Sequence, residues 1–108
     1  MIFISIPQRP TLEPMIAIAR FEVPLGQAAQ FESQLSVALE ALAAAPGYID
    51  GEIGQNLDEL GLWTIVTRWQ NVGSYRRALS SNRAKLEAIP VLALAIDEPG
   101  AYELPVTE

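Results

Sequence analysis

The side chains best suited to chemistry in this sequence are aromatic rings, a phenol and an amide. Trp63 and Trp69 have the same parity in the run LWTIVTRW, so a strand there would place both indoles on one face. Tyr75 lies one turn into the next predicted helix, and Asn82 follows on the same apolar stripe. Such groups can hold an aromatic molecule, exclude water and stabilise a developing oxyanion. We expect catalytic contacts from Trp69, Tyr75 and Asn82, and substrate binding by Trp63, Phe21 and Leu79.

Each of these residues also has a purely structural interpretation. Core packing explains most buried tryptophans, and a core tyrosine can leave its hydroxyl at the rim. The run Ser80-Ser81-Asn82 can instead be a helix break, in which Ser81 or Asn82 caps the following segment. From the sequence alone, both interpretations stay open.

The residue types that are missing restrict the chemistry further. The 108 residues include no histidine and no cysteine, which removes the usual general base, thiolate nucleophiles and most ligands of zinc or haem. We therefore expect no metal and no cofactor, and the lack of cysteine fits a cytoplasmic protein. Lysine and arginine total 7 against 13 acidic residues, so nucleic acid and anionic membranes are unsuitable partners.

The elements that must position these residues follow the order strand, helix, strand, strand, helix, strand. Residues 1–14 are rich in proline and are expected to form a separate N-terminal arm, with residues 15–108 as one domain. Strands are predicted at 15–23, 48–55, 62–69 and 101–104, and helices at 25–45 and about 72–89. This order is the split βαβ arrangement of α+β ferredoxin-like folds, a four-stranded antiparallel sheet with helices on one face.

Apolar residues at helical spacing should face the sheet. In the first helix these are Ala28, Phe31, Leu35, Ala38, Leu39 and Leu42, and in the second they are Val72, Tyr75, Leu79, Leu86 and Ile89. Ser80-Ser81 and Pro90 are the positions at which the second helix can break or end.

Both faces of the sheet are expected to be apolar at its centre. The third predicted strand carries Trp63 and Ile65 on one face and Leu62 and Val66 on the other. A sheet wetted on one side should alternate apolar and polar residues, so we expect the second face to pack on a twin sheet in a homodimer. The charged residues of that second face are Arg20, Arg68 and Glu22, with an ion pair expected between Glu22 and one of the arginines.

Four segments carry a resemblance to a known family: MIAIARFEVPLG, APGYIDGEI, LWTIVTRWQNVGSYRRAL and DEPGAYEL. With these segments, residues 15–104 resemble the antibiotic biosynthesis monooxygenase family. The resemblance implies a dimeric α/β barrel of ferredoxin-like protomers, each with a pocket between its sheet and its helices. It also implies that some relatives oxygenate phenols or quinone precursors with O₂ and without flavin, metal or haem.

Related members of that family bind and degrade haem through an asparagine, a tryptophan and a histidine. Ungapped matching places Ala19, Trp69 and Ala88 at these positions, so only the tryptophan remains and haem ligation of that kind is not available. We expect a cofactor-independent monooxygenase acting on a small electron-rich aromatic or quinone-type molecule. The alternative is a non-enzymatic dimer that binds a small ligand or serves a structural role. An enclosed cavity of a few hundred Å³ favours the enzyme, and a filled core favours the alternative.

Overall fold

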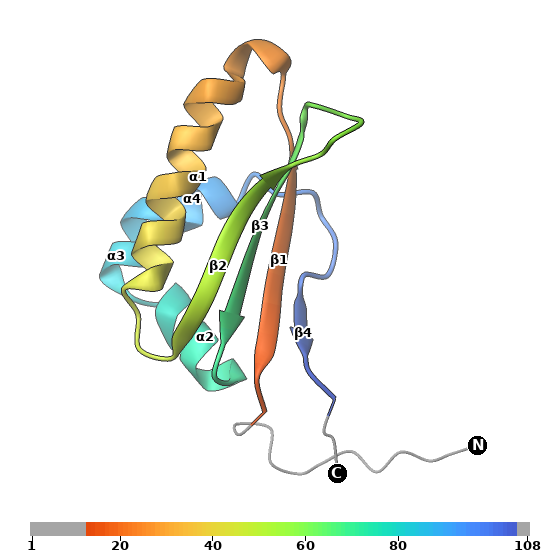
Figure 1. Ribbon diagram of the computed structural model, residues 1–108. Coiled ribbons are helices and arrows are strands. Elements are labelled where there is room, and N and C mark those ends of the chain that lie inside the picture. Colours follow the sequence, from red (N-terminus) through yellow and green to blue (C-terminus); the bar gives the residue numbers. More distant parts are fainter. Residues whose placement is uncertain (1–12, 106–108) are drawn as a thin grey trace, which may run out of the picture.

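The computed structural model describes residues 13–105, which form a four-stranded antiparallel sheet with the helices on one face (Figure 1). The elements are β1 (Met15–Glu22), η2 (Leu25–Gln27), α1 (Ala28–Ala43), β2 (Tyr48–Gln55), β3 (Leu62–Trp69), α2 (Val72–Leu79), α3 (Asn82–Glu87), α4 (Ile89–Leu92) and β4 (Ala101–Glu103). The strand order is β2-β3-β1-β4, which confirms the predicted ferredoxin-like arrangement. The predicted arm at 1–14 falls outside the described residues except for its last two positions. Among residues 13–105, no helix is long and apolar enough to span a membrane.

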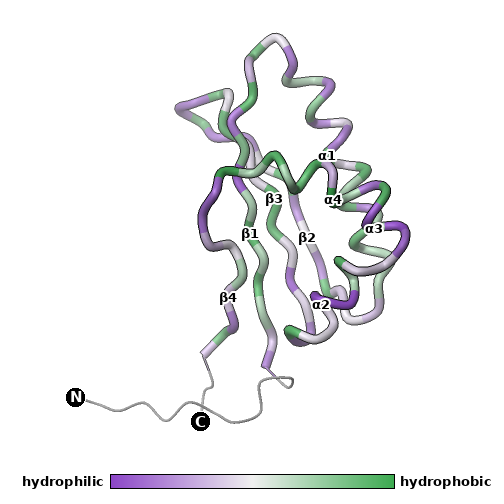
Figure 2. The backbone as a smooth tube through the Cα atoms, turned by 180° about the vertical axis from the view of Figure 1, so that it is seen from behind, coloured by the Kyte–Doolittle hydropathy of each residue, from purple (hydrophilic) through white to green (hydrophobic). Residues whose placement is uncertain are grey.

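The two central strands set the position of the core. They pair along their whole length, with Met15 opposite Trp69 and Glu22 opposite Leu62. Buried and less buried residues alternate along β3, as a strand with one face against helices requires. Figure 2 shows these central strands as the most hydrophobic part of the sheet, between more polar edges.

The core divides into two clusters of buried residues beneath the helices. The Trp69 cluster consists of Met15, Ala17, Ala38, Ala41, Leu42, Trp69, Ala78, Ala84 and Ala88. The Trp63 cluster consists of Phe21, Val23, Phe31, Leu35, Trp63 and Ile65. The predicted stripe of α1 is confirmed, because all six of its residues lie in one of the two clusters or pack against it.

The second helix, predicted at about 72–89 with a possible break at Ser80-Ser81, is divided at that position and again near Ala88 into α2, α3 and α4. The Ser81 side chain caps α3 by accepting a hydrogen bond from the Ala84 N–H at 3.1 Å, which replaces the backbone bond that a continuous helix would need. The break changes which side chains of this segment face the sheet. Leu86, expected to face the sheet, is 78% exposed, whereas Ala84 and Ala88 are fully buried.

The arginines on the outer face of the sheet pair differently from the prediction. Arg20 donates through Nε and Nη2 to the two carboxylate oxygens of Glu98, both at 2.7 Å. Arg68 Nε lies 3.5 Å from Asp50 Oδ1. The expected partner, Glu22, forms neither ion pair. The α4–β4 connection runs beside β1 (Figure 1), and this tertiary contact brings Glu98 to Arg20.

Candidate functional site

A small cavity lies between the helix-facing side of the sheet and the helices. Its walls come from β1, β3, α1, α2 and α4, through Ala17, Ile18, Ala19, Leu42, Ile65, Thr67, Tyr75 and Leu92. Its volume is about 30 Å³, which is room for one or two water molecules. This is smaller than the cavity expected of an enzyme, so an aromatic substrate can enter only if a wall residue moves.

Trp69 fixes one end of this region without lining the cavity. Its side chain is fully buried, and its ring packs edge-on against Tyr48 at 5.4 Å and tilted against Tyr75 at 5.6 Å. Its indole Nε1–H donates to Thr67 Oγ1 at 2.8 Å. The only polar group of Trp69 is therefore satisfied within its own strand, and Trp69 acts on the cavity by positioning its neighbours.

Thr67 is a cavity residue that the sequence analysis did not single out. Its side chain is 3% exposed, and because Oγ1 accepts the Trp69 bond, the hydroxyl hydrogen stays available to donate. Within residues 13–105 it makes no hydrogen bond as a donor. The available signal was its parity, since Thr67 is the polar member of the helix-facing set in LWTIVTRW.

Tyr75 meets Thr67 at the cavity wall, as the sequence analysis expected of its position on the inner face of the helix. Burial raises the pKa of the Tyr75 phenol above its ordinary value of 10.0, so the phenol is neutral and can donate a hydrogen bond at neutral pH. Its hydroxyl makes no hydrogen bond to any of the described residues. Two residues that carry a hydroxyl donor, Tyr75 and Thr67, thus line one largely apolar cavity.

The other predicted site residues lie away from the cavity wall. Phe21 and Trp63 belong to the Trp63 cluster, where the Phe21 ring is 5.1 Å from that of Phe31. Leu79 packs against the Trp69 cluster. Asn82 is exposed as the first residue of α3, a position that agrees with the helix-break interpretation and not with the predicted catalytic contact.

One wall of the cavity comes from α4, a helix of four residues. Val91 and Leu92 of α4 pack against both core clusters, and Leu92 also lines the cavity. After α4 the chain is tied to β1, because the Ile96 N–H donates to the Arg20 carbonyl at 2.7 Å. This wall of the cavity is therefore carried by a short element held in place from its C-terminal side.

The Arg20–Glu98 pair makes this attachment pH-dependent. The hydrogen bond from Arg20 lowers the pKa of the Glu98 carboxyl below its ordinary value of 4.5. A carboxyl with a depressed pKa contributes stability above its unfolded pKa and loses it as the pH falls through the folded pKa. We expect Glu98→Gln to lower the Tm at pH 7, with the difference from wild type shrinking between pH 5 and pH 3. Thermal unfolding followed by circular dichroism checks this.

The matched control for this prediction is Asp97→Asn, which removes one negative charge from the neighbouring position. Asp97 forms no ion pair among the described residues, so the variant tests the effect of net charge alone. Equal Tm shifts at every pH for Glu98→Gln and Asp97→Asn would contradict the assignment of the effect to the Arg20–Glu98 bond.

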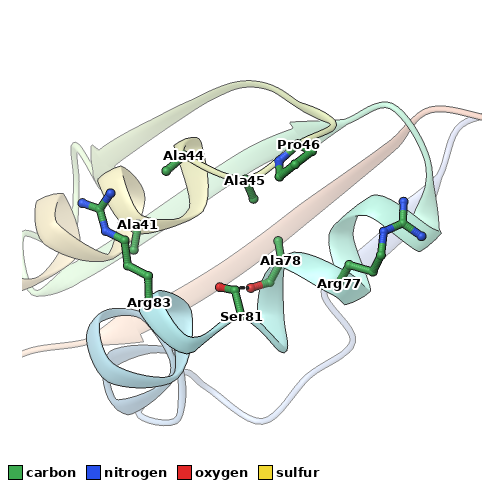
Figure 3. Close-up of a pocket in the computed structure, with 8 residues that line it drawn as sticks. All are labelled: Ala41, Ala44, Ala45, Pro46, Arg77, Ala78, Ser81 and Arg83. Atoms are coloured by element: carbon green, nitrogen blue, oxygen red, sulfur yellow. Dashed lines mark hydrogen bonds between the residues drawn. The ribbon is translucent and has the colours of Figure 1, made fainter.

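A second, larger pocket opens between the C-terminal end of α1 and the segment from α2 to α3 (Figure 3). It has a volume of about 370 Å³, and its lining comprises Ala41, Ala44, Ala45, Pro46, Arg77, Ala78, Ser81 and Arg83. Arg83 Nε donates a hydrogen bond to Glu87 Oε1 at 3.0 Å, and Arg77 Nη2 donates one to Ser74 Oγ at 3.4 Å. None of the predicted site residues lines this pocket, whereas Tyr75 lines the smaller cavity.

A comparison with protein-family models identifies the family of this chain. The model described as antibiotic biosynthesis monooxygenase matches residues 14–86. The chain belongs to the antibiotic biosynthesis monooxygenase family. The match spans β1 to α3 and ends before α4, so Thr67, Trp69 and Tyr75 lie inside the family region and Leu92 lies outside it.

Solved structures share the fold of this family member. SnoaB, a cofactor-independent oxygenase from Streptomyces nogalater, is 24% identical with a TM-score of 0.74, over 88% of this chain and 96% of SnoaB. A conserved protein from Methanosarcina mazei Go1 is 20% identical with a TM-score of 0.69, over 84% of this chain and 92% of that one. Rv0793 from Mycobacterium tuberculosis is 16% identical with a TM-score of 0.66, over 88% and 97%. The comparison with curated proteins gives no match.

Proposed function

We propose that this protein is a cofactor-independent monooxygenase that acts on a small electron-rich aromatic molecule of the phenol or anthrone type. The observation that carries the proposal is the pair of hydroxyl donors, Tyr75 and Thr67, at one apolar cavity of a family member. SnoaB, described as a cofactor-independent oxygenase, has the same fold. The non-enzymatic alternative has no comparable observation beyond the small volume of the cavity.

The proposed chemistry takes its electrons from the substrate. The ring methylene of an anthrone, which is conjugated with the ring carbonyl, loses a proton, and the resulting anion passes an electron to O₂ and then combines with the superoxide to form a peroxide. Loss of water converts that carbon to a carbonyl, so one oxygen atom enters the product and the other leaves with the two methylene hydrogens. The role of Tyr75 and Thr67 is to hydrogen-bond the substrate oxygen that carries the negative charge.

The protein has no histidine to accept the substrate proton. The neutral Tyr75 phenol is a donor and not a base at neutral pH, because burial raises its pKa. Stabilisation of the anion by two donors lowers the pKa of the substrate itself, so water can take the proton. This role needs substrates that are already weakly acidic, which anthrones and hydroquinones are.

The experiment that tests the proposal is oxygen uptake by the metal-free protein with anthrone, under air enriched in ¹⁸O₂. The expected result is one ¹⁸O atom per anthraquinone formed, at a rate above that of a protein-free solution and unaffected by EDTA. A rate equal to the protein-free rate across anthrone and hydroquinone substrates would overturn the proposal. A rate abolished by EDTA would overturn the cofactor-independent mechanism.

The proposal includes a homodimer through the face of the sheet opposite the helices, as the family resemblance implies. On that face Ile16, Ile18, Leu62 and Val66 are only partly buried within the protomer, and Tyr102 is 51% exposed. Apolar residues from three neighbouring strands at one surface form the kind of patch that marks an interface.

We expect Val66→Lys to convert the dimer to a monomer, because it places a charge at the centre of the apolar face. Analytical ultracentrifugation should give twice the 11.8 kDa chain mass for the wild type and the single chain mass for the variant. The matched control is Leu94→Lys, which introduces the same charge at a residue that is 64% exposed on the helical side. A wild-type protein that is monomeric at micromolar concentration would contradict the proposed dimer.

A further inference from the structure

The cavity lies where the two core clusters meet. Ala17 and Leu42 of its wall belong to the Trp69 cluster, whereas Ile65 belongs to the Trp63 cluster. Leu92 of α4 packs against both clusters and lines the cavity. Trp63 does not line the cavity, so a ligand that meets both Thr67 and Trp63 requires a residue that packs on both clusters, such as Leu92, to move.

Trp63 differs from Trp69 in the state of its indole N–H. Its side chain is 7% exposed, and its Nε1–H finds no acceptor among the described residues. Trp69, on the same face of the same strand, donates to Thr67. A buried donor without a partner costs about 1–3 kcal/mol, and most buried polar groups avoid that cost. The N–H of Trp63 thus requires an acceptor that residues 13–105 do not supply.

The positions along β3 set the spacing of these donors. Thr67, Ile65 and Trp63 are successive helix-facing residues, and Ile65 is the cavity wall between the other two. Successive residues on one face of a strand are about 7 Å apart. Thr67 and Trp63 therefore place donors about 13 Å apart at the backbone, with an apolar floor between them.

We propose that Trp63 is a specificity-determining residue of the proposed oxygenation site. Its Nε1–H donates to an oxygen atom at the far end of a ligand whose near-end oxygen meets Tyr75 and Thr67. The ligand class is a planar, fused-ring aromatic molecule with oxygen acceptors at opposite ends of its long axis. This inference rests on the proposed function because it uses the same cavity.

The first test uses the indole N–H signals of the wild-type protein, which contains two tryptophans. A ¹⁵N–¹H spectrum is recorded without oxygen while 2,6-dihydroxynaphthalene is added, and the titration is repeated with 2-naphthol, which lacks the second hydroxyl. The signals are assigned with the variant Trp63→Phe. The expected result is a downfield shift of the Trp63 signal with the diol, little shift of it with 2-naphthol, and a Trp69 signal that keeps its hydrogen-bonded position.

The second test compares affinities. Trp63→Phe keeps an aromatic ring in the core and removes the N–H, so it should weaken binding of 2,6-dihydroxynaphthalene about fivefold, the loss of one neutral hydrogen bond. Binding of 2-naphthol should stay within about twofold, since that ligand has no oxygen at the Trp63 end. Equal weakening of both ligands would show that Trp63 only packs, and would overturn the inference.

The outcomes separate this inference from the proposed function. A shift of the Trp63 signal with selective loss in Trp63→Phe, without oxygen uptake on any substrate, supports the ligand class and overturns the oxygenase. Oxygen uptake without that selectivity supports the oxygenase and overturns the role of Trp63. Absence of binding by either naphthol at millimolar concentration overturns the inference outright.

Discussion

The variant Tyr75→Phe is expected to lower the turnover number for anthrone about 100-fold, the usual effect of removing one donor to a developing oxyanion. The Tyr75 hydroxyl makes no hydrogen bond to the described residues, so the free energy of unfolding should change by less than about 1 kcal/mol. Steady-state oxygen uptake and urea denaturation measure the two quantities. Because the pKa of Tyr75 is raised, the wild-type activity that depends on the neutral phenol should persist to pH 10.

Tyr48→Phe is the matched control for this variant. Tyr48 packs against Trp69 from its other side at 5.4 Å, and it does not line the cavity. The same atom is removed from the same kind of residue, so turnover should stay within about twofold of wild type. Equal losses in Tyr48→Phe and Tyr75→Phe, or full activity in Tyr75→Phe, would contradict the role assigned to the Tyr75 hydroxyl.

The variant Trp69→Ala is expected to lower the free energy of unfolding by about 3–5 kcal/mol, the range for truncating a fully buried aromatic side chain. The loss includes the ring contacts with Tyr48 and Tyr75 and the hydrogen bond that fixes Thr67. Urea denaturation at one fixed protein concentration measures it.

Trp69→Phe separates packing from hydrogen bonding at the same site. Phenylalanine keeps most of the apolar volume but leaves Thr67 Oγ1 without its donor, so about 1–2 kcal/mol should be lost. A loss under about 1 kcal/mol for Trp69→Ala would show that the core collapses around the missing ring, and the positioning role of Trp69 would then be wrong.

The strands and the first helix followed directly from local pattern. Alternation of buried and less buried residues in LWTIVTRW and helical spacing from Phe31 to Leu42 are properties of short segments. These patterns were sufficient for the order of the elements along the chain and for the face on which Trp69 and Tyr75 lie. For the second helix the sequence left a break at Ser80-Ser81 open, and the structure shows that break with Ser81 as the cap and Ala84 and Ala88 buried.

The sequence predicted the types of residue at the candidate site but not which residues line it. Tyr75 was expected from its place on the helix, whereas Asn82 was displaced to the surface by the helix break. Thr67 was missed because a threonine in a strand has no special chemistry until its neighbour's hydrogen bond orients its hydroxyl. The pairing of Arg20 with Glu98 spans 78 positions of the chain, and no local pattern reports such a contact.

The sequence by itself determined the family, the sheet with helices on one face, and chemistry without imidazole or thiol, because these depend on residue types and short-range periodicity. Only the tertiary structure decided that the Trp69 N–H donates to Thr67, while the Trp63 N–H finds no acceptor among the described residues. It also decided that Leu92 lines a cavity of about 30 Å³ between the two clusters. The physical reason is that hydrogen-bond satisfaction and cavity volume depend on how distant segments pack, which local pattern does not specify.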